Sequence, residues 1–152
     1  MLVNRVAETA TPPKTPQETG PAAAATSVEG ASFTREEIAA GLRAAFKLFE
    51  HWGIAASDAR ILLGSPSLRT FQRWKAGQIA DIPNDTAWRI GDLMGIHKAL
   101  RYMFTDPERG YRWIRQPNAA FGGQSALDRM LGGAPSDVAA VRAYLDAERG
   151  AW

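Results

Sequence analysis

The side chains of this sequence that could recognise a ligand most directly lie in the stretch LRTFQRWK. Gln72 and Arg73 follow Arg69 by three and four residues, so all three share one side of a helix, with Thr70 and Lys75 flanking them. A helix that presents arginine, glutamine and threonine outward is what a reader of the DNA major groove needs. The pattern favours a recognition helix, and a solvated amphipathic helix is the alternative.

The opposite side of the same helix is apolar. Leu68, Phe71 and Trp74 recur every three residues, and we expect all three to be buried. In front of them the turn Gly64-Ser65-Pro66 predicts a break between two short helices. The first of these, near residues 56–63, would bury one apolar face. The pair resembles a helix-turn-helix unit.

Two serines precede the predicted recognition helix. Ser65 is the expected N-cap, with Pro66 at the first helical position, where a missing amide hydrogen costs nothing. Helix N-terminal amides near Ser65 and Ser67 could hold a DNA phosphate. The full set of candidate DNA-binding residues is Ser65, Ser67, Arg69, Thr70, Gln72, Arg73 and Lys75.

No constellation of residues predicts catalysis by the chain, and neither a cofactor nor a metal is expected. His51 and His97 are 46 residues apart and neither belongs to a ligand pair of metal-site spacing. Ser125 and Asp128 have the spacing of a capping box rather than of a nucleophile with its base. We therefore expect each of these residues to have a structural role and not a catalytic one.

Composition narrows the class of protein further. The 152 residues predict one domain or two very small ones, and no cysteine is available for a disulfide or a thiolate metal site. The net charge is only +2, but residues 54–79 hold four basic side chains against one acidic one. The absence of a secretory signal and of a membrane-length apolar run predicts a cytoplasmic protein, nucleoid-associated when bound to DNA.

The predicted elements divide the chain into four parts, and all the folded parts read as helical. Residues 1–32 are rich in proline and alanine and predict a disordered tail. Residues 33–80 form the helix-turn-helix portion, whose first helix begins at a capping box formed by Thr34 and Glu37 and ends at Gly53. The fold class is therefore all-α.

Residues 81–115 predict connecting or dimerisation helices. The helix expected from Asp85 to Phe104 is apolar on more than one side, so it must be covered on more than one side. It is either the central core helix or part of a dimer interface. A homodimer is expected because one small helix-turn-helix unit contacts too little DNA for strong discrimination.

Residues 116–152 hold a glycine-ended connection carrying Phe121, a short helix capped by Ser125, and a last helix. The run PNAAFGGQSALDRMLGG, followed by VRAYLDAERGAW, resembles the C-terminal toxin-binding region of the Xre, MbcA and ParS antitoxin family. The segment GIHKALRYMF and the downstream Trp113 resemble the helix that precedes that region. The resemblance covers about residues 34–152.

The resemblance implies an all-α antitoxin with an N-terminal helix-turn-helix portion and a small helical toxin-binding portion. Such proteins neutralise a RES-class toxin, which consumes NAD, and repress their own operon. The implied partners are that toxin and operator DNA, with no membrane. The residues implied in toxin binding are Phe121, Gly122, Gly123, Leu127, Arg149 and Trp152. A stand-alone helix-turn-helix transcriptional regulator is the alternative.

Overall fold

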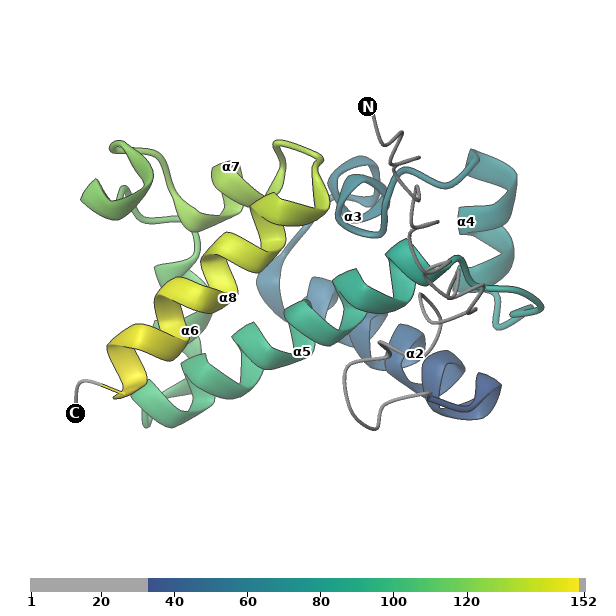
Figure 1. The fold of residues 1–152 in the computed structure, drawn as a ribbon, viewed down its shortest axis with the longest axis horizontal. Helices are drawn as coiled ribbons and strands as arrows, with labels where there is room; N and C mark the ends of the chain where they lie inside the picture. Colours follow the sequence, from purple (N-terminus) through teal and green to yellow (C-terminus); the bar gives the residue numbers. More distant parts are fainter. Residues whose placement is uncertain (1–32, 151–152) are drawn as a thin grey trace, which may run out of the picture. The chain divides into compact units, whose positions relative to one another are not determined.

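The computed structural model describes residues 33–150, and the tail predicted for residues 1–32 lies outside this range, as does Trp152. Within residues 33–150 the chain forms seven α-helices and one 3-10 turn, with no β-strand, which confirms the all-α fold (Figure 1). In chain order these elements are α2 (Arg35–Trp52), α3 (Ala56–Leu62), α4 (Leu68–Lys75), α5 (Asn84–Met103), α6 (Pro107–Trp113), η1 (Ala119–Phe121), α7 (Ala126–Met130) and α8 (Pro135–Gly150).

The ends of α2 follow from local sequence. The Thr34 hydroxyl accepts a hydrogen bond from the Glu37 amide, and the Glu37 carboxylate accepts one from the Thr34 amide, which confirms the predicted capping box. Gly53 ends the helix with φ 63°, in the left-handed region that favours glycine. One face of α2 is buried, with Leu42, Phe49 and Trp52 among its core residues.

Helix α5 is the central element of the core. It crosses between α2 and α8, and it also contacts α6 (Figure 1). Leu93, Ile96 and Leu100 are almost fully buried, so the apolar residues on more than one side of α5 are covered within the chain itself. Trp88 and Tyr102 are the large apolar side chains of α5 that stay exposed.

The close packing of α8 on α5 depends on a glycine. A β-carbon at Gly95 would lie 2.5 Å from Nε of Arg142, whose side chain extends from α8 across α5. Arg142 donates hydrogen bonds through Nη1 to the Gly91 carbonyl and to the Asp92 carboxylate, at 3.3 and 3.2 Å. The bare backbone at Gly95 therefore makes room for the polar contact between the two helices.

The C-terminal helices cover the other side of α5. The predicted capping box of Ser125 and Asp128 is present at the start of α7. Helix α8 buries Val138, Val141 and Leu145 against the rest of the core. These three residues lie three and four apart, the spacing of one helical face.

Candidate functional site

Helix α4 packs against α2 and buries two aromatic side chains. Phe71 and Trp74 are buried as predicted, and the Phe71 ring centroid lies 5.5 Å from that of Phe46 on α2. Leu68 was predicted to join them, but it is 56% exposed. Leu68 is the first residue of an eight-residue helix, and the contact with Phe46 of α2 is made three residues later, at Phe71, so Leu68 extends beyond that contact.

The other face of α4 carries the polar side chains predicted to read DNA. Arg69, Gln72, Arg73 and Lys75 are exposed, and Thr70 is half-buried. None of the four exposed side chains makes a hydrogen bond or ion pair within residues 33–150 that would hold it to the protein. These groups are therefore free to donate to a ligand, while the helix beneath them is fixed by Phe71 and Trp74.

The expected cap of α4 was placed two residues too early. Ser67, not Ser65, is the N-cap, and its hydroxyl accepts a 3.1 Å hydrogen bond from the Thr70 amide. Ser65 has φ 54° and continues the left-handed turn that starts at Gly64. Nε of Arg60 donates to the Pro66 carbonyl at 2.6 Å, which ties the turn to α3. Both serines are exposed beside the N-terminus of α4.

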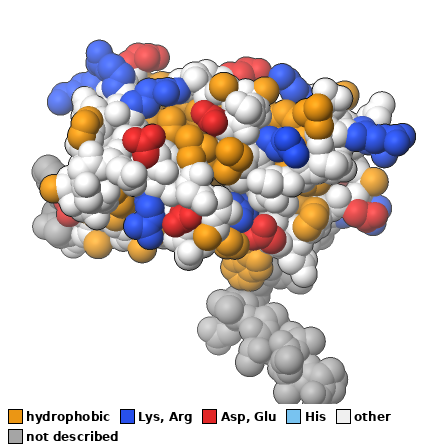
Figure 2. Space-filling view, turned by 90° about the horizontal axis from the view of Figure 1, so that it is seen from above, with side chains coloured by type: hydrophobic (Ala, Val, Ile, Leu, Met, Phe, Trp, Pro, Cys, Tyr) orange, Lys and Arg blue, Asp and Glu red, His pale blue; other side chains and the backbone are white. Residues whose placement is uncertain are grey.

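The surface of the protein is mixed in charge. On the face seen in Figure 2, Lys and Arg side chains are interspersed with Asp and Glu, and hydrophobic side chains lie between them. With a net charge of +2, the whole chain attracts a polyanion weakly. Attraction to DNA would therefore come from the local excess around α4.

The toxin-binding residues predicted near η1 fall into two groups. Gly122 and Gly123 are exposed, with φ 66° and 87°, and a β-carbon on either would meet open space. Phe121 and Leu127 are only 8% and 6% exposed. The Phe121 ring lies edge-on to Tyr144 of α8 at 5.2 Å, so it anchors the glycine turn to the core.

The loop around η1 is closed by backbone hydrogen bonds. The Asn118 amide donates to the Gln124 carbonyl, and the Gly123 amide donates to the Asn118 carbonyl, both at 3.0 Å. The Asn118 side chain accepts from the Ala120 amide at 2.9 Å. The turn is therefore a preorganised surface feature, which lowers the entropy cost of binding a partner there.

Arg149 lies at the far end of α8 and is half-buried. Its guanidinium carbon is 5.2 Å from the ring centroid of Tyr102, which is itself 70% exposed. An exposed cation-π pair of this kind contributes roughly 0.5 to 1 kcal/mol to stability. The half-buried arginine and the exposed aromatic ring are of the residue types that carry binding energy in protein interfaces.

One buried residue of consequence was missed by the sequence analysis. Arg89 of α5 is 3% exposed, and its Nε donates to the Asp85 carboxylate at 2.9 Å. Its Nη2 donates to the Gly133 carbonyl at 2.8 Å. The i,i+4 spacing of Asp85 and Arg89 indicates an ion pair on one helix face. It does not predict burial, because such pairs are also common on solvated helix faces.

Neither histidine takes part in a cluster that could hold a metal ion, and within residues 33–150 no group of three or more His, Cys, Asp or Glu side chains converges. His51 stacks on Tyr111 with ring centroids 5.5 Å apart. Burial lowers the pKa of His97, and the positive charges of Arg101 and His51 lower it further. His97 therefore takes up a proton less readily in the folded chain than in the unfolded one.

We expect His97 to make the fold sensitive to acid. Since its folded pKa is below its ordinary value of 6.5, the unfolded chain binds the proton first, and stability falls as the pH drops below about 6.5. The slope from this group is at most about 1.4 kcal/mol per pH unit. Urea denaturation between pH 7.5 and 5 should show a flatter dependence for His97→Gln than for the unsubstituted chain. Parallel curves would contradict this assignment.

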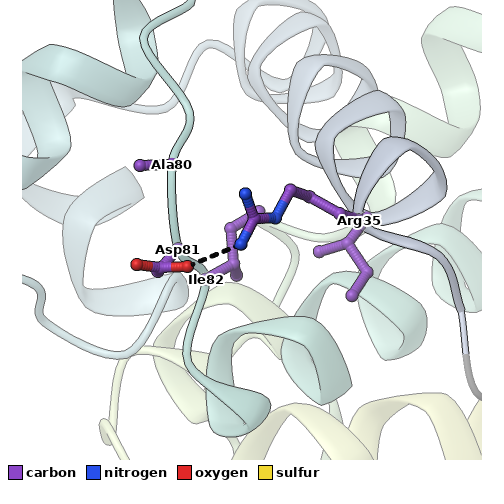
Figure 3. Close-up of a pocket in the computed structure, with 5 residues that line it drawn as sticks. Arg35, Ala80, Asp81 and Ile82 are labelled. Atoms are coloured by element: carbon purple, nitrogen blue, oxygen red, sulfur yellow. Dashed lines mark hydrogen bonds and ion pairs between the residues drawn. The ribbon is translucent and has the colours of Figure 1, made fainter.

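A shallow pocket of about 200 Å³ lies between the start of α2 and the loop before α5 (Figure 3). It is lined by Arg35, Ile38, Ala80, Asp81 and Ile82, and Arg35 pairs with Asp81 at 3.1 Å across it. Both charged side chains are highly exposed, so the pair contributes at most about 1 kcal/mol to stability.

None of the helices described by the structure is both long and apolar enough to cross a bilayer.

Comparison with known proteins connects the C-terminal helices to a partner. Residues 99–150 match the family model of the antitoxin Xre/MbcA/ParS C-terminal toxin-binding domain. An uncharacterized protein of Sinorhizobium fredii, y4oB, is 46% identical over 113 residues, which are 74% of this chain and 87% of that protein. The chain therefore carries a toxin-binding domain of the Xre/MbcA/ParS antitoxin family. No solved structure matches the antitoxin.

The matched residues locate the toxin-binding domain of the antitoxin. The domain begins at Ala99, inside α5, and runs through α6, η1 and α7 to the end of α8. It therefore contains the exposed glycine turn at residues 122–123 as well as the Tyr102 and Arg149 pair. Helices α2, α3 and α4 lie outside the match, so the match does not bear on the role of α4.

Proposed function

We propose that this antitoxin neutralises a RES-class, NAD-consuming toxin by covering its active site, and that it represses its own operon through α3 and α4 as a helix-turn-helix. One observation carries the proposal: a single chain joins a toxin-binding domain at residues 99–150 to a separate helix whose basic face is exposed and whose apolar face is buried. The toxin would contact the glycine turn at residues 122–123 and the end of α8. Trp152, implied in toxin contact by family resemblance, lies beyond the described residues.

The DNA-binding part of the proposal concerns the exposed face of α4. Arg69→Ala or Arg73→Ala should each weaken binding to the operator by about 1 to 3 kcal/mol if the arginine pairs with a base edge. A phosphate contact would instead weaken binding to operator and random duplex alike. Electrophoretic mobility shift at one fixed salt concentration, with DNA from upstream of the antitoxin's own reading frame, measures both. Salt must be fixed because phosphate contacts make the affinity salt-dependent.

A matched control lies on α2. Arg43 is exposed on α2, so Arg43→Ala removes the same charge from outside the proposed recognition helix. It should leave operator affinity nearly unchanged. If Arg43→Ala and Arg73→Ala weaken binding equally, the effect comes from net charge, and α4 is not the recognition helix.

The toxin-binding part of the proposal concerns Arg149. Arg149→Ala should weaken the complex with the toxin by about 2 kcal/mol if the guanidinium is an interface anchor, with a smaller effect on the fold because the cation-π pair with the exposed Tyr102 contributes only about 0.5 to 1 kcal/mol. Co-expression with the protein encoded by the adjacent reading frame tests neutralisation, and calorimetric titration measures the affinity. Arg112→Ala, which removes an exposed arginine from the same domain, is the control. Equal neutralisation by both variants would exclude Arg149.

Pairing of two antitoxins is part of the proposal. A dimer would present two copies of α4 to half-sites separated by about 34 Å or a multiple of that distance. The core takes up most of the apolar surface of α5, so the exposed Trp88 is the residue of that helix best placed to serve a dimer contact. Light scattering of the antitoxin at micromolar concentration, alone and with its toxin, reports the oligomeric state.

A further inference from the structure

Arg89 is the only charged residue among residues 33–150 that is buried. Two of its nitrogens are hydrogen-bonded in different directions, Nε to Asp85 and Nη2 to the carbonyl of Gly133. The third, Nη1, is also buried and has no hydrogen-bond partner among the described residues. A buried guanidinium is costly unless its donors are satisfied, so the position of this side chain depends on both of its partners.

One side of the Arg89 contact belongs to the DNA-binding half of the chain. A β-carbon at Gly64 would lie 2.8 Å from the Asp85 carboxylate and 3.3 Å from Nε of Arg89. The neighbouring Leu63 carbonyl accepts a 2.8 Å hydrogen bond from the buried Thr86 hydroxyl. The turn between α3 and α4 therefore rests directly on the first turn of α5, at the Asp85 and Arg89 pair.

The other side belongs to the toxin-binding domain. Gly133 has φ 91° and lies in the turn between α7 and α8, within the residues that match that domain. Figure 1 shows this turn next to α3, and the Arg89 hydrogen bond spans 44 positions of the sequence to reach it. A single side chain thus contacts the turn that leads into α4 and the turn that leads into α8.

We propose that Arg89 is a positioning residue that sets the orientation of α4 from the toxin-binding domain, so that toxin binding changes the affinity of α4 for DNA. The inference rests on the proposed DNA-binding role of α4. Its physical basis is the planar fork of the guanidinium, which fixes the angle between its two partners. If the Gly133 carbonyl moves, Nη2 loses its acceptor while Nη1 already lacks one, so Arg89 and the turn at Gly64 must adjust together.

The coupling can be tested in the antitoxin alone with a double-mutant cycle. Gly133→Ala places a side chain at φ 91° in open space, so it strains the α7–α8 turn without a steric clash. Hydrogen exchange of the amides of residues 63–67 then reports the α3–α4 turn. We expect Gly133→Ala to change that exchange about threefold or more in the unsubstituted chain and not in an Arg89→Met background.

Two further variants keep the cycle interpretable. Arg89→Met should fold, because Asp85 is 45% exposed and can be hydrated once its partner is gone. If it does not fold, Arg89→Lys takes its place, since one ammonium group keeps the charge but cannot span both partners. Arg142→Met is the control: it removes another arginine that joins α8 to α5 but does not contact the α3–α4 turn, and the response to Gly133→Ala should persist.

The outcome separates this inference from the function on which it rests. An unchanged response to Gly133→Ala in the Arg89 variants, or no response in the unsubstituted chain, overturns the coupling even if the antitoxin binds its operator. Loss of the response only in the Arg89 variants supports the coupling. Operator affinity should then change about fivefold or more on addition of the toxin, and much less in the Arg89 variants. An antitoxin that passes the exchange cycle but does not bind upstream DNA would refute the role of α4 alone.

Discussion

Replacing Trp74 with alanine is expected to lower the free energy of unfolding by about 3 to 5 kcal/mol. Trp74 is 3% exposed and belongs to α4, an eight-residue helix that is too short to be stable without tertiary packing. Loss of the ring should therefore release α4 as well as leave a cavity. Urea denaturation followed by circular dichroism measures the change. DNA binding should be lost together with the order of α4.

The chain provides a matched control for this substitution. Trp88→Ala removes the same side chain from α5, where it is 67% exposed, and in the monomer it should change the free energy of unfolding by about 0.5 kcal/mol or less. The comparison separates burial from residue type. Equal costs for the two tryptophans would mean that α4 is not packed as described.

Gly64→Ala is expected to destabilise the fold by about 3 kcal/mol. Part of the cost is backbone strain, since φ is 95° and a residue with a β-carbon disfavours that region. The rest comes from displacement of the Asp85 carboxylate, which would leave the buried Arg89 without its ion-pair partner. Thermal and urea denaturation at neutral pH should both show the loss.

A substitution at Gly77 separates the cost of backbone strain from the cost of displacing Asp85. It has φ 84°, close to that of Gly64, but a β-carbon there has no neighbour within 4 Å. Gly77→Ala should therefore show the backbone strain alone, about 1 to 2 kcal/mol. If Gly64→Ala costs no more than Gly77→Ala, the Asp85 and Arg89 pair contributes little to the junction.

Helix α5 links the two ends of the antitoxin. Helix α5 contributes its first turns to the support of α4 and its last turns to the toxin-binding domain. Under the proposed function, in which one end binds DNA and the other a toxin, a shared element of this kind couples the two ends. Arg89 is the buried polar contact that joins the two ends in this structure.

The sequence by itself determined the helices whose ends are set by nearby residues. The capping boxes at Thr34 and Ser125 and the glycine stop at Gly53 were predicted correctly, because each involves hydrogen bonds within three or four positions of the chain. The all-α class and the likeness to the antitoxin family were also readable from sequence. The basic face of α4 was found because its spacing alone places those side chains together.

Local sequence patterns predicted the wrong N-cap for α4 and the wrong burial for Leu68. Ser65 and Ser67 both have hydroxyls suited to cap α4, and the choice depends on the left-handed conformation of Ser65, which is set by the turn that Arg60 holds. Leu68 has the spacing of a core residue, but its exposure depends on how far the contact with α2 extends along α4. In both cases the deciding contact comes from another element.

Only the tertiary structure decided what each face of α5 does and which groups are buried together. The sequence left α5 as either a core helix or a dimer surface, because periodicity reports that a face must be covered and not by what. The burial of Arg89 could not be predicted, since an Asp and an Arg four residues apart are ordinary on a solvated helix, and the carbonyl that accepts from Nη2 lies 44 positions away. Contacts of that separation depend on how the helices pack, and no pattern within a single helix encodes them.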